Sequence, residues 1–337
     1  MSNNVALART GNAAELERFR EVQRLCYECA DAVAATLEPG VTEREACRRM
    51  RRWLRDRGVD DWLHTPFAWF GDRTAFQGFK VPTQFLPSGK RLEEGMPYIL
   101  DMAPVREGFS ADIGYGGVLG ENRIWQQLDT DLAAYRTLIL DLVRERRAFA
   151  DIYAEVDALI DRQGYQNRHK KYPGRVIGHQ VGIIGGPLPK GVGFPFGVRF
   201  LQTIGRELVK ERLEGRSPLW NGARQSQHPP TPGLWAVEPH IGFRGVGVKF
   251  EELLVVTEDD AYWLDDDLPH VHRWAARETA QAAGGAAQAA GGAAQAAGGA
   301  AQAAGGAAQA AGGAAQAAGG AAQAAGGAAQ AAGESAE

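Results

Sequence analysis

Two segments of the chain place paired carboxylates in apolar strands, and this feature constrains the fold more than any other. The first segment, residues 98–114, contains Asp101 and Asp112 on either side of a predicted turn. Taking Arg106 and Glu107 as the two loop residues predicts a hairpin in which Asp101 lies directly opposite Asp112. Opposed side chains in a hairpin have Cβ atoms about 4.5–5.5 Å apart, so the two carboxylates are expected to repel each other.

The second segment, residues 235–257, repeats this arrangement. A turn at Arg244-Gly245 predicts that Glu238 lies opposite Glu251. Both segments are rich in Leu, Ile and Val, which predicts buried strands, and buried like charges are costly unless something neutralises them. The four carboxylates therefore require shared protons or divalent cations between them.

One histidine could complete such a metal site. His179 lies in an apolar, glycine-rich stretch, VIGHQVGIIG, where an isolated histidine is more often a hydrogen-bonded core residue. With four carboxylates nearby, His179 is instead expected to be a metal ligand. Four carboxylates and one imidazole suit two divalent ions bridged by carboxylate oxygen, with Mn(II) or Co(II) expected first and Zn(II) or Fe(II) as alternatives.

The remaining sequence predicts an α+β core with internal pseudo-symmetry. Helical periodicity covers residues 15–37, 43–57, 127–147 and 150–163, and Thr42 is the predicted N-cap of the second helix. Strand and turn composition begins at Trp62 and returns from residue 175 to 264. Because helices precede strands twice, the two halves are expected to resemble each other.

The last 58 residues, 280–337, differ from the rest because they repeat the heptad AAQAAGG. The repeat has no large apolar residue for a coiled-coil seam, and its glycine pair interrupts an alanine helix in every period. We therefore expect three parts: an N-terminal helical segment at 1–61, a catalytic domain at 62–279, and a flexible, at most transiently helical tail at 280–337 without a catalytic role.

Composition excludes several classes of protein. The net charge is −4, which excludes a basic field for nucleic acid or anionic lipid. No run of eighteen apolar residues occurs and the N-terminus lacks an apolar signal segment, so a cytoplasmic protein is expected. Cys26, Cys29 and Cys47 are odd in number and clustered, which favours reduced thiols over disulfides or a zinc site.

The order and spacing of Asp101, Asp112, His179, Glu238 and Glu251 resemble the pita-bread metallopeptidase family. That family includes methionine aminopeptidases, Xaa-Pro aminopeptidases, prolidases and creatinases, and the resemblance runs from about residue 91 to 264. It implies a pseudo-symmetric α/β fold with curved antiparallel sheet inside and helices outside. It also implies that Asp101 binds one metal, that Asp112 and Glu251 bridge both, and that His179 and Glu238 complete the other site.

Two features distinguish this chain within the family it resembles. The chain before Trp62 is shorter than the creatinase-type N-terminal domain, so the nearest resemblance is to Xaa-Pro-peptidase-like members without it. Family peptidases also carry two substrate-side histidines, and Gln84 and Gly185-Gly186-Pro187 stand nearest their places here. His64 is the expected substitute for the first. His240 shares a strand face with Glu238 and is expected to bind substrate.

The resemblance implies a metal-dependent hydrolase that cleaves the N-terminal residue or the Xaa-Pro bond of short peptides. Glu238 would relay a proton and His64 would stabilise the oxyanion. Two alternatives stay open: a creatinase-like C–N hydrolase acting on a small amide or guanidino compound, and a pita-bread module that binds without cleaving. A short peptide is the expected partner, nucleic acid and membrane are not, and a homodimer is left open.

Overall fold

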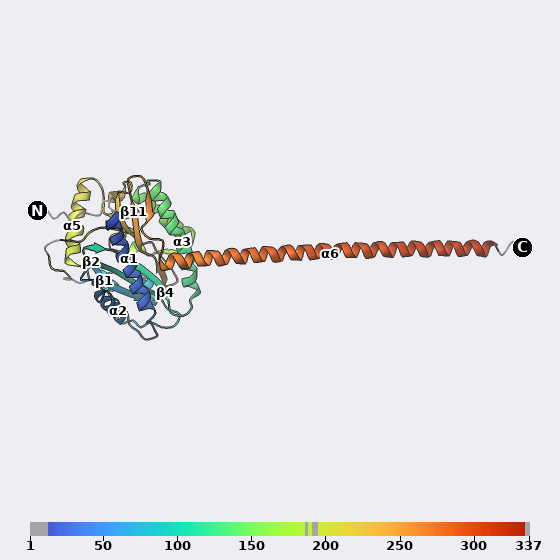
Figure 1. The fold of residues 1–337 in the computed structure, drawn as a ribbon, viewed down its shortest axis with the longest axis horizontal. Helices are drawn as coiled ribbons and strands as arrows, with labels where there is room; N and C mark the ends of the chain where they lie inside the picture. The colour runs from blue at the N-terminus through green and yellow to red at the C-terminus, as the bar shows by residue number, and fades with distance from the viewer. Residues whose placement is uncertain (1–12, 186–187, 191–194, 334–337) are drawn as a thin grey trace. The chain divides into compact units, whose positions relative to one another are not determined.

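The computed structural model describes residues 13–185, 188–190 and 195–333 (Figure 1). Its α-helices in these residues are α1 (Ala13–Ala34), α2 (Glu43–Arg55), α3 (Arg123–Arg144), α4 (Phe149–Arg162), α5 (Val198–Leu213) and α6 (Pro269–Gly333). Its short 3-10 helices are η1 (Gly71–Ala75), η2 (Pro82–Phe85), η3 (His169–Lys171), η4 (Pro173–Arg175) and η5 (Arg224–Ser226). Its strands are β1 (Asp61–Phe70), β2 (Pro97–Arg106), β3 (Phe109–Ser110), β4 (Ile113–Val118), β5 (Gln166–Asn167), β6 (Gly178–Val181), β7 (Leu219–Trp220), β8 (Gly233–Val237), β9 (His240–Phe243), β10 (Val246–Lys249), β11 (Glu252–Val256) and β12 (Ala261–Trp263).

The described strands form three antiparallel sheets. Strands β1 to β4 form one sheet, in which β2 pairs with each of the other three. A five-stranded sheet has the order β12-β11-β8-β6-β7, and a smaller sheet has the order β10-β9-β5. An isolated bridge between Gly114 of β4 and Glu251 joins the first sheet to the second half of the chain. The two halves therefore meet where the acidic residues were predicted.

Two hydrophobic cores hold helices against these sheets. Helices α1 and α2 lie over the sheet that contains β1, β2 and β4 (Figure 1), and Phe19 and Met50 are fully buried there. Helices α3 and α4 form the second core, in which Tyr135, Phe149 and Trp235 are fully buried. Each half thus has a helix pair on one side of its sheet, as the repeated order of helices and strands predicts.

The four predicted helices are present, with ends that agree to within four residues. Thr42 caps α2 through a capping box in which its hydroxyl accepts from the Glu45 N–H and Glu45 accepts from the Thr42 N–H. The prediction of strands and turns from 175 to 264 is wrong for residues 198–213, which form α5. Phe200 and Ile204 both line a cavity from this helix, at a spacing typical of one helix face.

The second hairpin has the predicted turn and register. Arg244 and Gly245 both have positive φ, 48° and 82°, as a two-residue type I′ turn requires. Val246 pairs with Phe243 at the turn, and the same register pairs Glu252 with Val237 on the next strands. Glu251 and Glu238 each lie one residue closer to the turn than that last pair.

The predicted register of the first hairpin is wrong by two residues. Asp101 pairs with Gly114, and Asp112 lies outside the strands. The loop residues are Glu107 and Gly108, which have φ of 53° and 89°, because glycine accepts positive φ at the second turn position without strain. An even shift keeps each side chain on the same face of the sheet, so both aspartates still point to one side.

The C-terminal repeat forms helix up to Gly333, where the sequence predicts a flexible and only transiently helical segment. Alanine and glutamine are good helix formers, and they outnumber the glycines in each heptad. The contacts divide the chain into two compact units between Trp274 and Ala275, so most of α6 belongs to the second unit. Within the described residues, no helix is both long and apolar enough to cross a membrane.

Candidate metal centre and active site

Six side chains that can bind a metal line the same cavity. The cavity has a volume of about 380 Å³, and its metal-binding side chains are His64, Asp101, Asp112, His179, Glu238 and Glu251. They come from β1, β2, β6 and the segments beside β4, β8 and β11. The structure therefore brings together all five ligands predicted from sequence, together with the predicted catalytic histidine.

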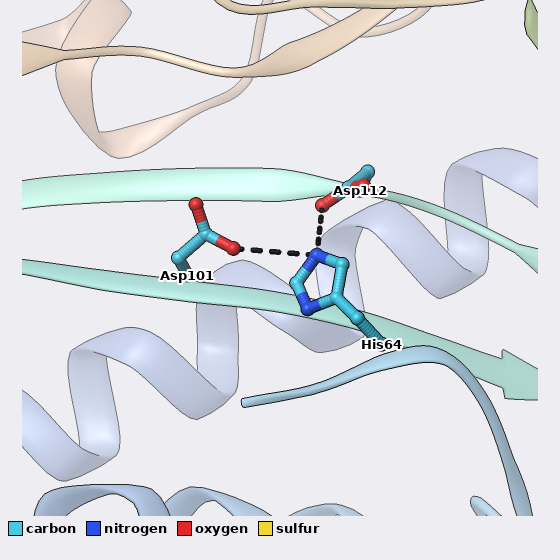
Figure 2. A group of neighbouring side chains, drawn as sticks. All are labelled: His64, Asp101 and Asp112. Carbon is cyan, nitrogen blue, oxygen red and sulfur yellow. Dashed lines mark hydrogen bonds and ion pairs between the residues drawn. The ribbon is translucent and has the colours of Figure 1, made fainter. Parts of the chain in front are cut away.

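His64 lies against the two aspartates of the first hairpin. Its Nε2 is 3.1 Å from Oδ1 of Asp112 and 3.3 Å from Oδ1 of Asp101, so the ring joins the two carboxylates (Figure 2). Its Nδ1 is 3.0 Å from the carbonyl oxygen of Thr65, and its ring stacks on Phe67 at 5.0 Å between centroids. His64 is therefore held in place from three sides.

Asp112 is also in contact with the second histidine. Nε2 of His179 is 3.3 Å from Oδ2 of Asp112, and Nδ1 of His179 is 3.3 Å from the carbonyl oxygen of Gln180. Each oxygen of Asp112 thus meets one imidazole. Asp112 is the carboxylate shared by both histidines of the site.

Sequence reasoning missed Lys249, the last residue of β10. Its Nζ donates to Oε2 of Glu251 at 2.7 Å, to Oδ2 of Asp101 at 2.8 Å and to Oε2 of Glu238 at 2.9 Å. The signal was present in the sequence, because Lys249 stands two residues before Glu251. Residues two apart on an extended strand share a face, so an ammonium group was to be expected beside that carboxylate.

The site is electrostatically coupled throughout. Burial raises the pKa of Glu238 and Glu251, and neighbouring carboxylates raise that of Glu251 further. Burial opposes a charged lysine, but Asp101, Glu238 and Glu251 raise the pKa of Lys249 well above its usual value. The ammonium group is consequently charged at neutral pH, and it neutralises part of the negative charge that the sequence predicted.

Burial also opposes the charged form of His64. It alone would lower the pKa of His64, but the charge and hydrogen bond of Asp112, with a contribution from Asp101, raise that pKa to about 9. In return, the two histidines hold the pKa of Asp112 below its ordinary value although burial acts in the opposite direction. His64 and Asp112 thus behave as an ion pair.

The donor set fits a divalent cation. Ligand atoms of His64, Asp101 and Asp112 lie within 4.8 Å of one another, and so do those of Asp112, His179 and Glu251. Imidazole combined with carboxylate oxygen suits the borderline divalent metals as well as Mn(II). The residues can therefore hold a metal, while Lys249 already engages two of these carboxylates, Asp101 and Glu251.

The structure does not bring His240 to the cavity. The side chain is fully buried at the start of β9, where its ring meets Phe76 at 4.7 Å and its Nδ1 lies 3.2 Å from the hydroxyl of Tyr172. Tyr172 lines the cavity and His240 does not. His240 therefore contacts a lining residue, Tyr172, without lining the cavity itself.

The walls of the cavity are apolar. Among the described residues, its aromatic and aliphatic lining includes Leu63, Phe67, Trp69, Phe85, Leu86, Val176, Phe196, Phe200, Ile204 and Leu219. The charged groups in that described lining are those of the metal-binding set itself. A ligand that fills this space therefore meets charge at one end and hydrocarbon elsewhere.

Comparison with known proteins shows the family of this chain. The model of metallopeptidase family M24 matches residues 17–258, and the chain belongs to that family. An uncharacterized peptidase of Staphylococcus aureus is 22% identical over 170 residues, which are 50% of this chain and 46% of that relative. The chain thus spans less than half the length of that curated relative.

Solved structures share the fold at low sequence identity. An X-Pro aminopeptidase from Thermotoga maritima matches with a TM-score of 0.56 at 16% identity, over 78% of this chain and 63% of that one. Dipeptidase PepE from Mycobacterium ulcerans matches with a TM-score of 0.55 at 19% identity, over 78% and 61%. A methionine aminopeptidase from Rickettsia prowazekii matches with a TM-score of 0.52 at 14% identity, over 77% and 99%. The prediction of a pita-bread fold with antiparallel sheets and surrounding helices is confirmed.

Proposed function

We propose that this chain is a metal-dependent peptidase that removes the N-terminal residue of short peptides or cleaves their Xaa-Pro bond. The observation that carries the proposal is the convergence of six metal-binding side chains in one cavity with apolar walls. Membership of metallopeptidase family M24 supports it, and the solved relatives with this fold include an X-Pro aminopeptidase and a methionine aminopeptidase.

A divalent cation in this centre would supply Lewis-acid polarisation of the scissile carbonyl and activation of water. Asp112, His179 and Glu251 would hold the cation. Mn(II) or Co(II) is our first proposal and Zn(II) or Fe(II) the alternative, because this donor set accepts all four. The sequence predicts two such ions.

Glu238 and His64 would carry the proton and the developing charge. Burial raises the pKa of Glu238, which makes its carboxylate a better proton acceptor for the attacking water and a proton donor to the leaving amine. His64 would donate Nε2–H to the oxyanion. It would do so once Asp112, which accepts this N–H in the structure, turns toward a bound cation.

The cavity supports an apolar residue at the cleaved end of the substrate. Apart from His64 and His179, which pair with Asp112, its described lining provides no cationic side chain for a peptide's C-terminal carboxylate, whereas the site carboxylates can accept an N-terminal ammonium group. We therefore favour aminopeptidase action on peptides whose first residues are apolar or proline. His240, acting through Tyr172, is proposed to position that substrate rather than to touch it.

The proposal is tested by incubating metal-free protein with Mn(II) or Co(II) and a panel of tripeptides and tetrapeptides. The panel includes proline at the second position and Met, Leu or Phe at the first. Free N-terminal amino acid is measured by amine labelling and chromatography. Absence of release across the panel, with metal binding demonstrated on the same sample, would contradict the peptidase proposal.

His64→Ala is expected to lower kcat by about 10²- to 10³-fold, because it removes a donor aimed at the oxyanion. The measurement is steady-state hydrolysis together with bound metal per chain. His272→Ala is the matched control, since His272 is exposed and pairs with Asp267 away from the cavity. A rate within threefold of the wild type, or one lowered only in proportion to lost metal, would remove the oxyanion role.

Phe196→Ala is expected to lower kcat/KM for apolar substrates by about tenfold, because an aromatic wall of the cavity is lost. Phe196 is 38% exposed, so its truncation should leave the melting temperature nearly unchanged. Tyr262→Ala serves as control, because Tyr262 is similarly exposed, at 37%, and lies outside the lining of the cavity. Equal loss in both variants would argue against this wall as the specificity surface.

A second candidate function is hydrolysis of an apolar amide that is not a peptide. The observation that favours it is the same apolar lining, in which the described residues outside the metal-binding set offer a peptide's carboxylate end no charged partner. A polar guanidino substrate fits this lining less well. Turnover of aryl or alkyl amides by a preparation that leaves the peptide panel intact would decide for this function.

Two further proposals follow from residues outside the site. The three cysteines are free and buried, which supports the cytoplasmic location proposed from sequence. The repeat at 280–337 is proposed to take no part in catalysis. The division of contacts between Trp274 and Ala275, outside the matched residues 17–258, supports that boundary.

A further inference from the structure

Lys249 is a fully buried lysine among residues that should bind metal. Its side chain has no solvent exposure, and it ends β10 two residues before Glu251. A buried ammonium group without compensation would be strongly destabilising, so the surroundings must be built to hold it.

The hydrogen bonds of Nζ are those of a fully satisfied cation. An ammonium group has three N–H donors, and all three are used on carboxylates: Asp101 at 2.8 Å, Glu238 at 2.9 Å and Glu251 at 2.7 Å. The ring of Tyr172 adds a cation–π contact at 5.1 Å. Three carboxylates from separate segments thus converge on one positive charge.

The backbone opposite the lysine is shaped to admit its stem. A Cβ atom at Gly114 would lie 2.4 Å from Cε, 3.0 Å from Cδ and 3.2 Å from Cγ of Lys249. Gly114 pairs with Asp101 and bridges Glu251, so it lies between two of the three acceptors in the sheet. The missing side chain at this position provides the space that the lysine fills.

We propose that the Lys249 ammonium occupies one of the two cation positions that the four carboxylates define. The chain then binds one divalent ion instead of two. Asp112, His179 and Glu251 would hold that ion. The inference rests on the proposed function only in assuming that the centre binds a divalent cation.

The lysine differs from a metal in what it supplies. An ammonium group is a monovalent cation and a hydrogen-bond donor, but it is not a Lewis acid and cannot be removed by a chelator. It holds Asp101, Glu238 and Glu251 together in the absence of metal, so the metal-free protein keeps part of the neutralisation that a second ion would provide.

The test counts manganese with and without the lysine. Metal-free wild type and Lys249→Ala are dialysed against Mn²⁺, and bound manganese per chain is measured by elemental analysis. We expect one ion in the wild type and two in Lys249→Ala, because the substitution removes the ammonium group and opens its space. Lys190→Ala is the matched control and is expected to bind one ion, since Lys190 pairs with Asp60 at an exposed position.

Two ions in the wild type, none in the wild type, or one in Lys249→Ala would each overturn the proposal. Anomalous diffraction at the manganese edge from wild-type crystals decides the matter should Lys249→Ala fail to fold. One peak beside Asp112 and His179, with Nζ still on Asp101 and Glu238, supports the proposal, whereas two peaks overturn it. Neither measurement uses a substrate, so failure of the peptidase proposal leaves this result unaffected.

Discussion

Asp112→Asn is expected to lower the rate of peptide release by about 10³-fold or more and to abolish stoichiometric metal binding. Asp112 belongs to both candidate ligand groups, and each of its oxygens meets one histidine of the site. Asparagine keeps the size of the side chain but removes its charge and one of its two acceptor oxygens. The measurement combines steady-state kinetics with elemental analysis of the same sample.

Asp259→Asn is the control for this experiment, because Asp259 is exposed in the turn between β11 and β12. It should keep both metal and rate. Full activity in an Asp112→Asn variant that lacks metal would contradict a metal-dependent mechanism. Full metal content with a lost rate would instead assign Asp112 to catalysis and leave cation binding to His179 and Glu251.

The second large effect is expected at Glu252, the neighbour of a site residue. Glu252→Gln should destabilise the protein by about 3 kcal/mol, because it breaks a buried ion pair and leaves its partner uncompensated. The Glu252 carboxylate is fully buried and accepts two hydrogen bonds from Arg136, at 2.7 and 3.0 Å, and one from His270 at 3.1 Å. The melting temperature should fall by roughly 6–12 °C.

Glu251→Gln is the matched variant one residue away, and the expected result is different. Burial and like charges raise the pKa of Glu251 in the metal-free protein, so removing its charge relieves repulsion. We expect a free energy of unfolding within about 1 kcal/mol of the wild type. Similar losses of stability in both variants would show that Glu251 is held by its surroundings as firmly as Glu252.

The stabilising effect of the Glu252 carboxylate is expected to depend on pH. Although burial opposes it, His270 and Arg136 lower the pKa of Glu252 below the usual 4.5. A carboxyl group with a lowered folded-state pKa stabilises the protein above its unfolded pKa, and this contribution is lost as pH falls through the folded value. The difference in melting temperature between Glu252→Gln and the wild type should therefore shrink on acidification below about pH 4.5.

The paired carboxylates were predictable because strand periodicity is a local property. Alternation alone places Asp101 and Asp112, or Glu238 and Glu251, on one face of a sheet, and a two-residue error in register leaves the face unchanged. The two aspartates therefore still point to the same side, although Asp101 pairs with Gly114 and does not lie opposite Asp112. The correct turn was also readable, since a type I′ turn prefers glycine at its second position, which Gly108 occupies.

Sequence alone was enough to predict four of the helices, the Thr42 cap and the hairpin at Arg244-Gly245, and to name the residues proposed to bind metal, since each of these depends on neighbours in the chain. How the charges of these residues are balanced depends on contacts between distant segments, which local sequence does not specify. Lys249 could be placed beside Glu251 from strand alternation, but its bonds to Asp101 and Glu238 depend on segments that are distant in sequence. The enclosure of His240 behind Tyr172 and the apolar lining from α5 likewise depend on packing between distant elements. Local periodicity specifies which way a side chain points, whereas its partners are set by the elements that fold against it.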